Sequence, residues 1–307
     1  MNFCNEKQLL KTIKRGSYDL YGHFCPNTSM KISLLPSNCT SFVYEVLNFN
    51  VEVNTTISTD DKHFHINLSK LPQDGNFDET FYKNLTNYVT VLKTSSVFSE
   101  VGLFMNASDM IYHRNNSKAP GWLDYDKWLN NIMDYYIISF DKFNPCNNQF
   151  KTGIVPLDNS DAQTNNTLMK FQNVLNDSKM AEDKIYLEFS LSPTVNDTNT
   201  ETLPTCYVTY KKLCELGNYT FYWCADNADA LFSKGKFARD IKAKGIVAKY
   251  IDTSDPTGNC GCDNQNQFIT YSMIFRGFLN QTPFTDCEKF NNATIQLVNI
   301  ILHFNPL

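Results

Sequence analysis

Residues 244–263 read KGIVAKYIDTSDPTGNCGCD. A run rich in β-branched residues, 246–251, leads directly into two acids, Asp252 and Asp255, and then into a glycine and two cysteines. β-branched residues favour strands, whereas Gly, Pro, Asn and Asp mark the turn that follows. The stretch therefore predicts a buried strand that ends in a polar loop, and its two acids are the first candidates for chemistry.

Strand-like and helix-like segments alternate upstream of this strand. The helical spacing of apolar residues is clearest in 78–94, whereas the strand-like segments are short apolar runs. We expect strands at 19–24, 40–53, 100–105, 136–141 and 184–191, and helices at 78–94, 124–136, 167–177 and 230–244. This alternation indicates an α/β protein with a parallel sheet, either open or closed into a barrel. No linker or internal repeat divides the chain, so residues 1–307 are expected to form a single domain.

Composition narrows the function classes. Hydrophobic residues make up 42% of the chain, which is ample for a sizeable core. The net charge is −5 and the 27 basic residues are scattered, so neither a nucleic-acid partner nor a polybasic membrane patch is expected. No stretch approaches 18 uninterrupted apolar residues, and no membrane span is expected.

The chain is rich in N-glycosylation sequons. Random placement would give roughly five N-x-S/T triplets, yet the sequence has thirteen. This excess predicts a heavily glycosylated, secreted protein. The sequon asparagines are Asn27, Asn38, Asn54, Asn67, Asn84, Asn106, Asn115, Asn165, Asn176, Asn196, Asn218, Asn280 and Asn292.

Ten cysteines agree with an oxidising compartment and up to five disulfides. Their spacings fit no common zinc module. His63 and His65 share one face of a strand-like segment, but no third ligand is evident. We therefore expect neither a metal nor a cofactor. The first residues, MNFCNEKQLLKTIKRG, contain no apolar leader segment, so we expect a secretion leader to lie outside this numbering.

Several segments, in this order, resemble glycoside hydrolase family 18, the chitinase and chitinase-like group. VTYKKLCEL (208–216), Trp223 and KGIVAKYIDTSDPTGNC (244–260) are similar to the last third of that family. YGHFCPN with SNCTSFVYEV resembles its first two strands, DYYIISFD its sixth, and EDKIYLEFSLSP its seventh. The resemblance implies a (β/α)8 barrel of the TIM type. Short intervals suggest that the family's small α+β insertion is reduced or absent and that the fifth strand is abbreviated.

The resemblance also implies two disulfides. One would join Cys25 to Cys39, and the other would join Cys214 to Cys260, with Cys262 as the alternative. Each would contribute roughly 3–4 kcal/mol in the chain-entropy model. The remaining cysteines cannot be paired from the sequence: Cys4, Cys146, Cys206, Cys224, Cys287 and whichever of Cys260 and Cys262 is left over.

The family's general acid is the Glu of a D-x-x-D-x-D-x-E motif on the fourth strand, and this motif does not occur here. Two alignments of that strand are open. In the first, which fits better because it keeps the apolar Phe98, Val101 and Leu103, FSEVGLFMN (98–106) takes its place. The acids then become Ser99, Gly102, Phe104 and Asn106. In the second, HFHINLS (63–69) takes its place, and Ser69 stands where the acid should be. Neither alignment keeps a group that donates a proton near neutral pH.

Other expected sugar contacts also differ. The tryptophan of the family's last strand corresponds to Lys249, or to Tyr250 if the alignment slips by one. The sixth-strand Tyr-Asp pair corresponds to Phe140 and Asp141, so the acid is kept without its hydroxyl partner. By the same resemblance, Asp252 and Asp255 belong to the turn that closes the barrel.

The sequence therefore predicts a non-catalytic, secreted chitinase-like glycoprotein that binds an unknown protein or glycan partner. Two alternatives remain open. One is a glycosidase with a relocated acid, built from Asp141 and Asp252. The other is a surface or coat antigen whose glycans form its main functional surface.

Overall fold

The computed structural model describes residues 63–67, 79–94, 100–115, 125–147, 153–158, 166–196, 206–215, 222–262 and 267–294. The strands expected at 19–24 and 40–53 lie outside these ranges, as do Cys4, Cys25, Cys39 and Ser69.

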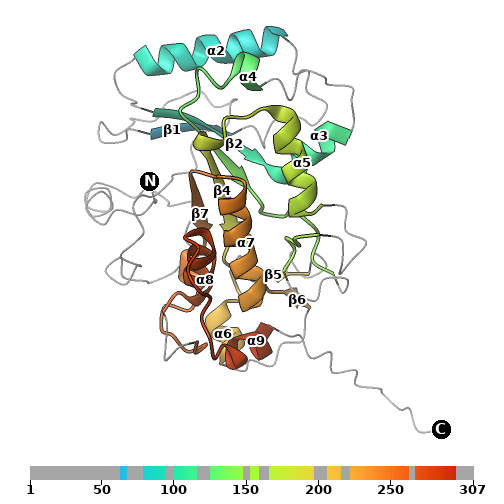
Figure 1. The fold of residues 1–307 in the computed structure, drawn as a ribbon, viewed down its shortest axis with the longest axis vertical. Helices are drawn as coiled ribbons and strands as arrows, with labels where there is room; N and C mark the ends of the chain where they lie inside the picture. The colour runs from blue at the N-terminus through green and yellow to red at the C-terminus, as the bar shows by residue number, and fades with distance from the viewer. Residues whose placement is uncertain are drawn as a thin grey trace, which may run out of the picture.

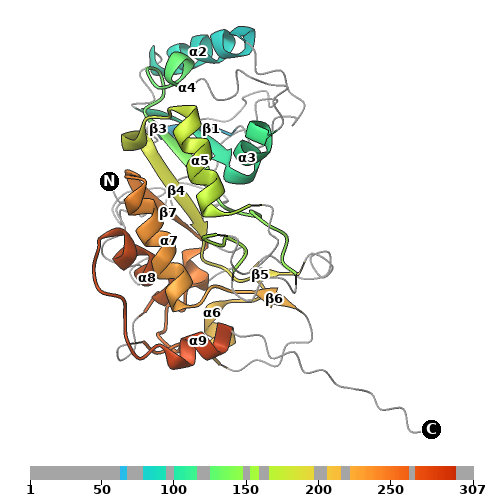
Figure 2. The same cartoon turned by 45° about the vertical axis from the view of Figure 1, so that its right-hand side comes forward.

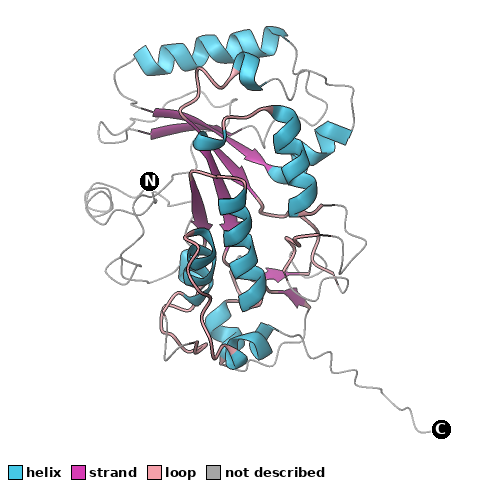
Figure 3. Cartoon of the chain, viewed as in Figure 1, coloured by secondary structure: helices cyan, strands magenta, loops and turns pink. Residues whose placement is uncertain are grey.

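Five parallel strands form the main sheet (Figures 1 and 3). They are β1 (His63–Asn67), β2 (Glu100–Asn106), β3 (Tyr135–Ser139), β4 (Ile185–Ser190) and β7 (Gly245–Lys249), in that order across the sheet. The α/β class and the parallel sheet predicted from the sequence are confirmed. Spatial order follows chain order without a reversal, as it does along a β/α barrel and unlike in a doubly wound sheet. Closure of the barrel stays a prediction.

Helices follow most of these strands. They are α2 (Glu79–Thr94), α3 (Ala107–Asn115), α4 (Tyr125–Trp128), α5 (Leu168–Ser178), α6 (Tyr210–Cys214), α7 (Ala228–Asp240), α8 (Ile269–Phe278) and α9 (Glu288–Thr294). Short 3-10 turns occur at η4 (Glu182–Lys184) and η6 (Ile251–Thr253). Figures 1 and 2 show α7 alongside β4 and β7. The strands β5 (Thr194–Val195) and β6 (Trp223–Cys224) form a separate antiparallel pair.

The helix expected at 124–136 was wrong in length, because α4 ends at Trp128. The chain after it turns instead of continuing as a helix, and tertiary contacts take up its polar groups. Lys184 donates to the carbonyl oxygens of Asn130 and Met133 at 2.6 and 2.9 Å, and the Asn130 side chain bonds the Tyr136 hydroxyl at 3.0 Å. The Lys184 bonds therefore satisfy two backbone carbonyl oxygens that a continuing helix would have paired internally.

The side chains of the sheet divide between its two faces. One face carries apolar residues such as Leu103, Ile138 and Leu187, which are buried in the main core under the helices. On this side α7 and α8 approach closely through Gly235 and Gly277. A Cβ on Gly235 would lie 1.8 Å from the carbonyl oxygen of Ile274, so only glycine permits this contact.

Candidate functional site

The opposite face of the sheet changes character toward the carboxyl ends of its strands. A small buried cluster of Tyr135, Ile137, Tyr186 and Val247, with Phe104 packed against it, occupies the middle of this face. Because successive residues of a strand alternate between faces, the next positions on this face are polar. The parallel strands bring these polar side chains to one edge, the position at which β/α barrels carry their sites.

Ser139 and Glu188 are register neighbours on β3 and β4. The Ser139 hydroxyl donates to Glu188 Oε1 at 2.6 Å, and both residues are buried, with Glu188 only 3% exposed. The Asp141 amide donates to the same hydroxyl at 3.2 Å. Ser139 therefore joins the buried carboxylate to the turn that follows β3.

Lys249, the last residue of β7, forms an ion pair with Asp141. Its Nζ lies 2.8 Å from Asp141 Oδ2, and the contact reaches past β4, which separates β7 from β3. The side chains are 14% and 32% exposed, so the pair is shielded from water but not sealed. The Lys249 ammonium also lies 5.2 Å from the ring centroid of Tyr250.

The charge of Lys249 is strongly favoured at this position. Burial disfavours the charged ammonium, but the carboxylates of Glu188 and Asp141, together with Tyr250 and the Asp141 hydrogen bond, outweigh it. The pKa of Lys249 is therefore raised above its ordinary value. The charged lysine holds the carboxylate of Asp141 in a charge-assisted hydrogen bond, so this carboxylate has a fixed partner within the protein.

The sequence singled out three positions on β2, all on this face. A Cβ on Gly102 would lie 2.1 Å from the Tyr135 ring, so this glycine makes room for an aromatic side chain. Phe104 packs against the small cluster. Asn106 ends the strand beside Ser139 in the register, and its amide donates to Asp109 at 3.1 Å.

Of the site residues predicted from the sequence, Asp141 and Lys249 are in contact in the structure. Asn106, the last residue of β2, lies at the same edge of the sheet. Tyr250 follows directly in a left-handed conformation, with φ 60°. Asp252 lies in η6, partly exposed.

Sequence reasoning missed Glu188 and Ser139. A single acid inside the apolar strand IYLEFS was the signal that could have identified Glu188. A charged residue in such a run is buried only when it has partners. The serine carried no comparable signal.

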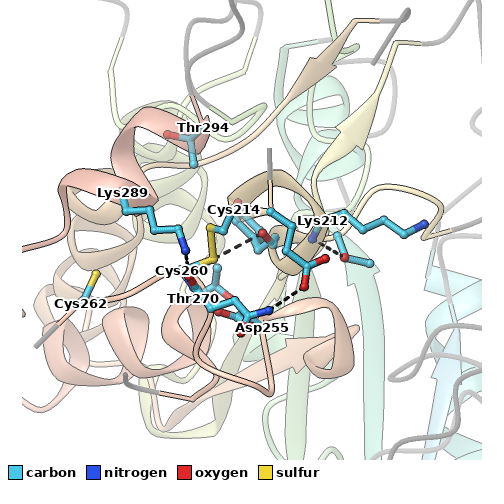
Figure 4. Close-up of a disulfide and its surroundings, with 12 residues drawn as sticks. Lys212, Cys214, Asp255, Cys260, Cys262, Thr270, Lys289 and Thr294 are labelled. Atoms are coloured by element: carbon cyan, nitrogen blue, oxygen red, sulfur yellow. Dashed lines mark hydrogen bonds between the residues drawn. A yellow bond between two sulfur atoms is a disulfide. The ribbon is translucent and has the colours of Figure 1, made fainter. Parts of the chain in front are cut away.

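The closing turn after β7 is a structural unit (Figure 4). Cys214 of α6 is joined to Cys260 by a disulfide, with a Cα–Cα distance of 5.0 Å. This is the pairing expected from the resemblance, and its alternative, Cys262, is joined to Cys287 instead. Asp255 is fully buried and accepts hydrogen bonds from the Cys260 amide at 2.6 Å and from the Thr257 hydroxyl at 2.9 Å. Asp255 therefore shapes the turn and cannot reach a substrate.

A further disulfide joins Cys146 to Cys224. It ties the segment after β3 to the β5–β6 pair, a link that the sequence left open. Both segments lie beyond the carboxyl ends of the strands, so this bridge fixes the loops that border the polar edge.

Most sequon asparagines whose side chains are described lie at the surface. Asn106 and Asn196 are partly exposed. Exposed positions on or at the ends of helices are Asn84, Asn115, Asn176, Asn280 and Asn292. The sequons at Asn27, Asn38, Asn54, Asn165 and Asn218 lie outside the described residues.

The described residues contain neither a membrane-spanning helix nor a group of metal-ligating side chains. No helix in these ranges combines the length and apolar character that crossing a membrane requires. Within the same part of the chain, no three His, Cys, Asp or Glu side chains gather in an arrangement that could hold a metal ion.

No family model matches the chain, and no curated protein matches it in sequence. Solved structures do. The catalytic domain 2 of Ostrinia furnacalis Group II chitinase shares 13% identity at a TM-score of 0.50, covering 70% of this chain and 63% of the chitinase domain. This chain therefore spans less than two thirds of that domain.

Two other structures are similar to the same extent. Ostrinia furnacalis Group IV chitinase shares 12% identity at a TM-score of 0.51, over 71% of this chain and 68% of its own. YKL-39, solved in the presence of chitooligosaccharides (GlcNAc4), shares 14% identity at a TM-score of 0.50, over 71% and 69%. At these identities the comparison establishes a chitinase-like fold and leaves the activity open.

Proposed function

We propose that this protein is a non-catalytic, secreted chitinase-like glycoprotein that acts by binding a protein or glycan partner. Residues 1–307 would form one barrel domain, trimmed relative to the chitinases that it resembles. One observation carries the proposal: the acid that corresponds to the family's sixth-strand Asp is paired with Lys249, in the position where the family has a sugar-stacking tryptophan. At these two positions an ion pair between Asp141 and Lys249 stands in place of a free acid and of a tryptophan that stacks on the sugar.

The strand order bears on the missing general acid. β2 pairs directly with β3, so no strand lies between them. If β7 is the eighth strand of the barrel, counting back makes β2 the fifth strand and β1 the fourth. This favours the second alignment, in which Ser69 stands at the acid position. The first alignment, with Asn106 there, requires that the fifth strand be lost. Both alignments replace the acid with a group that holds its proton.

A glycosidase with a relocated acid, expected from Asp141 and Asp252, is a weaker explanation of the same site, and so is one that uses Glu188. Asp141 is held as an ion pair, and Glu188 is buried beneath the edge with its carboxylate bonded to Ser139. A general acid needs contact with the leaving oxygen and a proton to give at working pH. The Asp141 carboxylate is paired with Lys249 and the buried Glu188 carboxylate is bonded to Ser139, so neither is placed to contact a leaving oxygen, which favours binding over hydrolysis.

Secretion and glycosylation rest on separate observations. Three disulfides join described segments, and disulfides persist in oxidising compartments. The exposed sequons on α2, α3, α5 and α9, and the one at Asn280 just after α8, are open to glycan attachment. A coat or antigen role would use these glycans as the functional surface. Partner binding that survives enzymatic deglycosylation would argue against that role.

The decisive experiment measures hydrolysis and binding together. The protein, Asp141→Asn, Glu188→Gln and the control Asp126→Asn, whose carboxylate is half exposed on α4, would be incubated with chito-oligosaccharides, and products quantified by mass spectrometry. We expect no product from any of the four proteins. Turnover by the wild type and Asp126→Asn that disappears in Asp141→Asn or Glu188→Gln would refute the proposal. Titration with the same oligosaccharides would then separate a glycan partner from a protein partner.

A further inference from the structure

The outer face of α2 carries two apolar side chains that the fold leaves exposed. Tyr88 is 37% exposed and Val91 is 64% exposed, whereas Tyr82, Leu85 and Val89 on the other face are buried. The face of α2 that packs against the core is therefore the opposite one. A group that packed over both side chains would remove this apolar surface from water.

A sequon lies in the same stripe. Asn84, Asn87, Tyr88 and Val91 are spaced i, i+3, i+4 and i+7, and all four are exposed, so they line one side of the helix. Asn84 opens the sequon Asn84-Leu85-Thr86. The side chain at i+4 in a helix leans back toward the N-terminus and covers the preceding turn. Tyr88 therefore leans toward the Asn84 amide.

We propose that the exposed stripe of α2 is the packing surface for an N-linked glycan carried by Asn84. The inference rests on the proposed secretion and glycosylation. An N-acetylglucosamine ring has an apolar face of C–H groups, and such a face packs against aromatic and aliphatic side chains as other apolar groups do. Linked to Asn84, the first sugar begins one turn from Tyr88, and the following sugars extend over the helix.

The same pairing occurs on α3. Tyr112 is 47% exposed and lies three residues before the exposed sequon asparagine Asn115, on the same side of the helix. The side chain of Asn115 leans back toward Tyr112. A glycan on either asparagine would also exclude a protein partner from that helix face because of its bulk. The stripe on α2 is thus a covered surface and not the docking surface for the partner.

The test separates the glycan from the side chain. The wild type, Asn84→Gln, Tyr88→Ser and the double variant would be secreted from a eukaryotic host. Peptide mass spectrometry would measure occupancy, and circular dichroism would measure the melting temperature. We expect Asn84 to be occupied. Loss of the glycan through Asn84→Gln should lower the melting temperature by about 2–4 °C when Tyr88 is present. In the protein that already carries Tyr88→Ser, the same substitution should lower it by less than half as much.

Asn292→Gln is the matched control. Asn292 is an exposed sequon asparagine on α9, and the preceding turn carries Glu288 and Lys289 instead of apolar side chains. Its removal should shift melting equally with and without Tyr88. A bare Asn84 in a chain glycosylated elsewhere, or an equal loss in both Tyr88 backgrounds, would overturn this inference alone. A chain secreted without any glycan would overturn both this inference and the proposed glycoprotein function.

Discussion

Replacing Lys249 with methionine should reveal how much the ion pair contributes to stability. Methionine keeps most of the side-chain volume and removes the charge together with the hydrogen bond to Asp141. It leaves Asp141 without this partner at 32% exposure and removes the cation that faces Glu188. Breaking a fully buried pair costs about 3–5 kcal/mol. Since water still reaches Asp141, we expect about 2–3 kcal/mol.

Urea unfolding at pH 7, with the disulfides intact, measures this loss. With an m-value of about 3 kcal/mol/M, the midpoint should fall by about 0.7–1 M. Lys242→Met is the control, because that lysine is 79% exposed and pairs with Glu182 at 3.5 Å. An exposed pair of this kind contributes at most about 1 kcal/mol.

A double-mutant cycle with Asp141→Asn tests whether the two residues act as a pair. Each single variant removes one charge of the pair, whereas the double variant removes both charges. We expect a coupling energy of about 1–2 kcal/mol. Additivity to within about 0.5 kcal/mol would refute the reasoning, and so would a Lys249→Met loss no larger than that of Lys242→Met.

The pH dependence has a definite sign. The folded-state pKa of Lys249 is raised, so its contribution is fully present below the pKa of the unfolded chain, about 10.4. The contribution is lost as pH rises beyond that value toward the folded pKa. The stability difference between the wild type and Lys249→Met should therefore be constant from pH 7 to 9 and shrink above about pH 10.4.

Two further predictions concern the frame that holds the site. Gly235→Ala should lower the free energy of unfolding by about 3 kcal/mol, because the new Cβ would lie 1.8 Å from a backbone oxygen of α8. In the same urea experiment the exposed neighbour Lys236→Ala should be nearly neutral, and equal effects would contradict the packing argument. Replacing Cys214 and Cys260 together with alanine should cost about 4 kcal/mol, because the bridge spans 46 residues. An unchanged unfolding midpoint in the double variant would show that the closing turn is stable without its bridge.

Much of the framework was predictable from local patterns. The expected segments 78–94, 167–177 and 230–244 correspond to α2, α5 and α7, and the apolar runs correspond to β2, β3, β4 and β7. In these segments local preference and tertiary packing agree. The segment 124–136 failed because its periodicity is helical, whereas Lys184 and other distant groups satisfy its backbone in a turn.

The polar edge was only partly predictable. Asp141 and Lys249 were identified separately, as positions where a family residue is kept or replaced. Their contact was not foreseen, nor was the participation of Glu188. Reading one strand at a time shows which residues alternate, but it does not show which strands are neighbours or how far a lysine reaches across them.

The sequence by itself determined the alternation of strands and helices, the thirteen sequons and the absence of the D-x-x-D-x-D-x-E acid. Each of these features depends only on residues that are close together in the chain. Only the tertiary structure decided that Lys249 neutralises Asp141, 108 residues earlier in the chain, above the buried Glu188. Strand order and register set those distances, and they depend on the packing of the whole sheet. Coulomb attraction between the two charges is strong only after the sheet has brought them together and excluded most of the water.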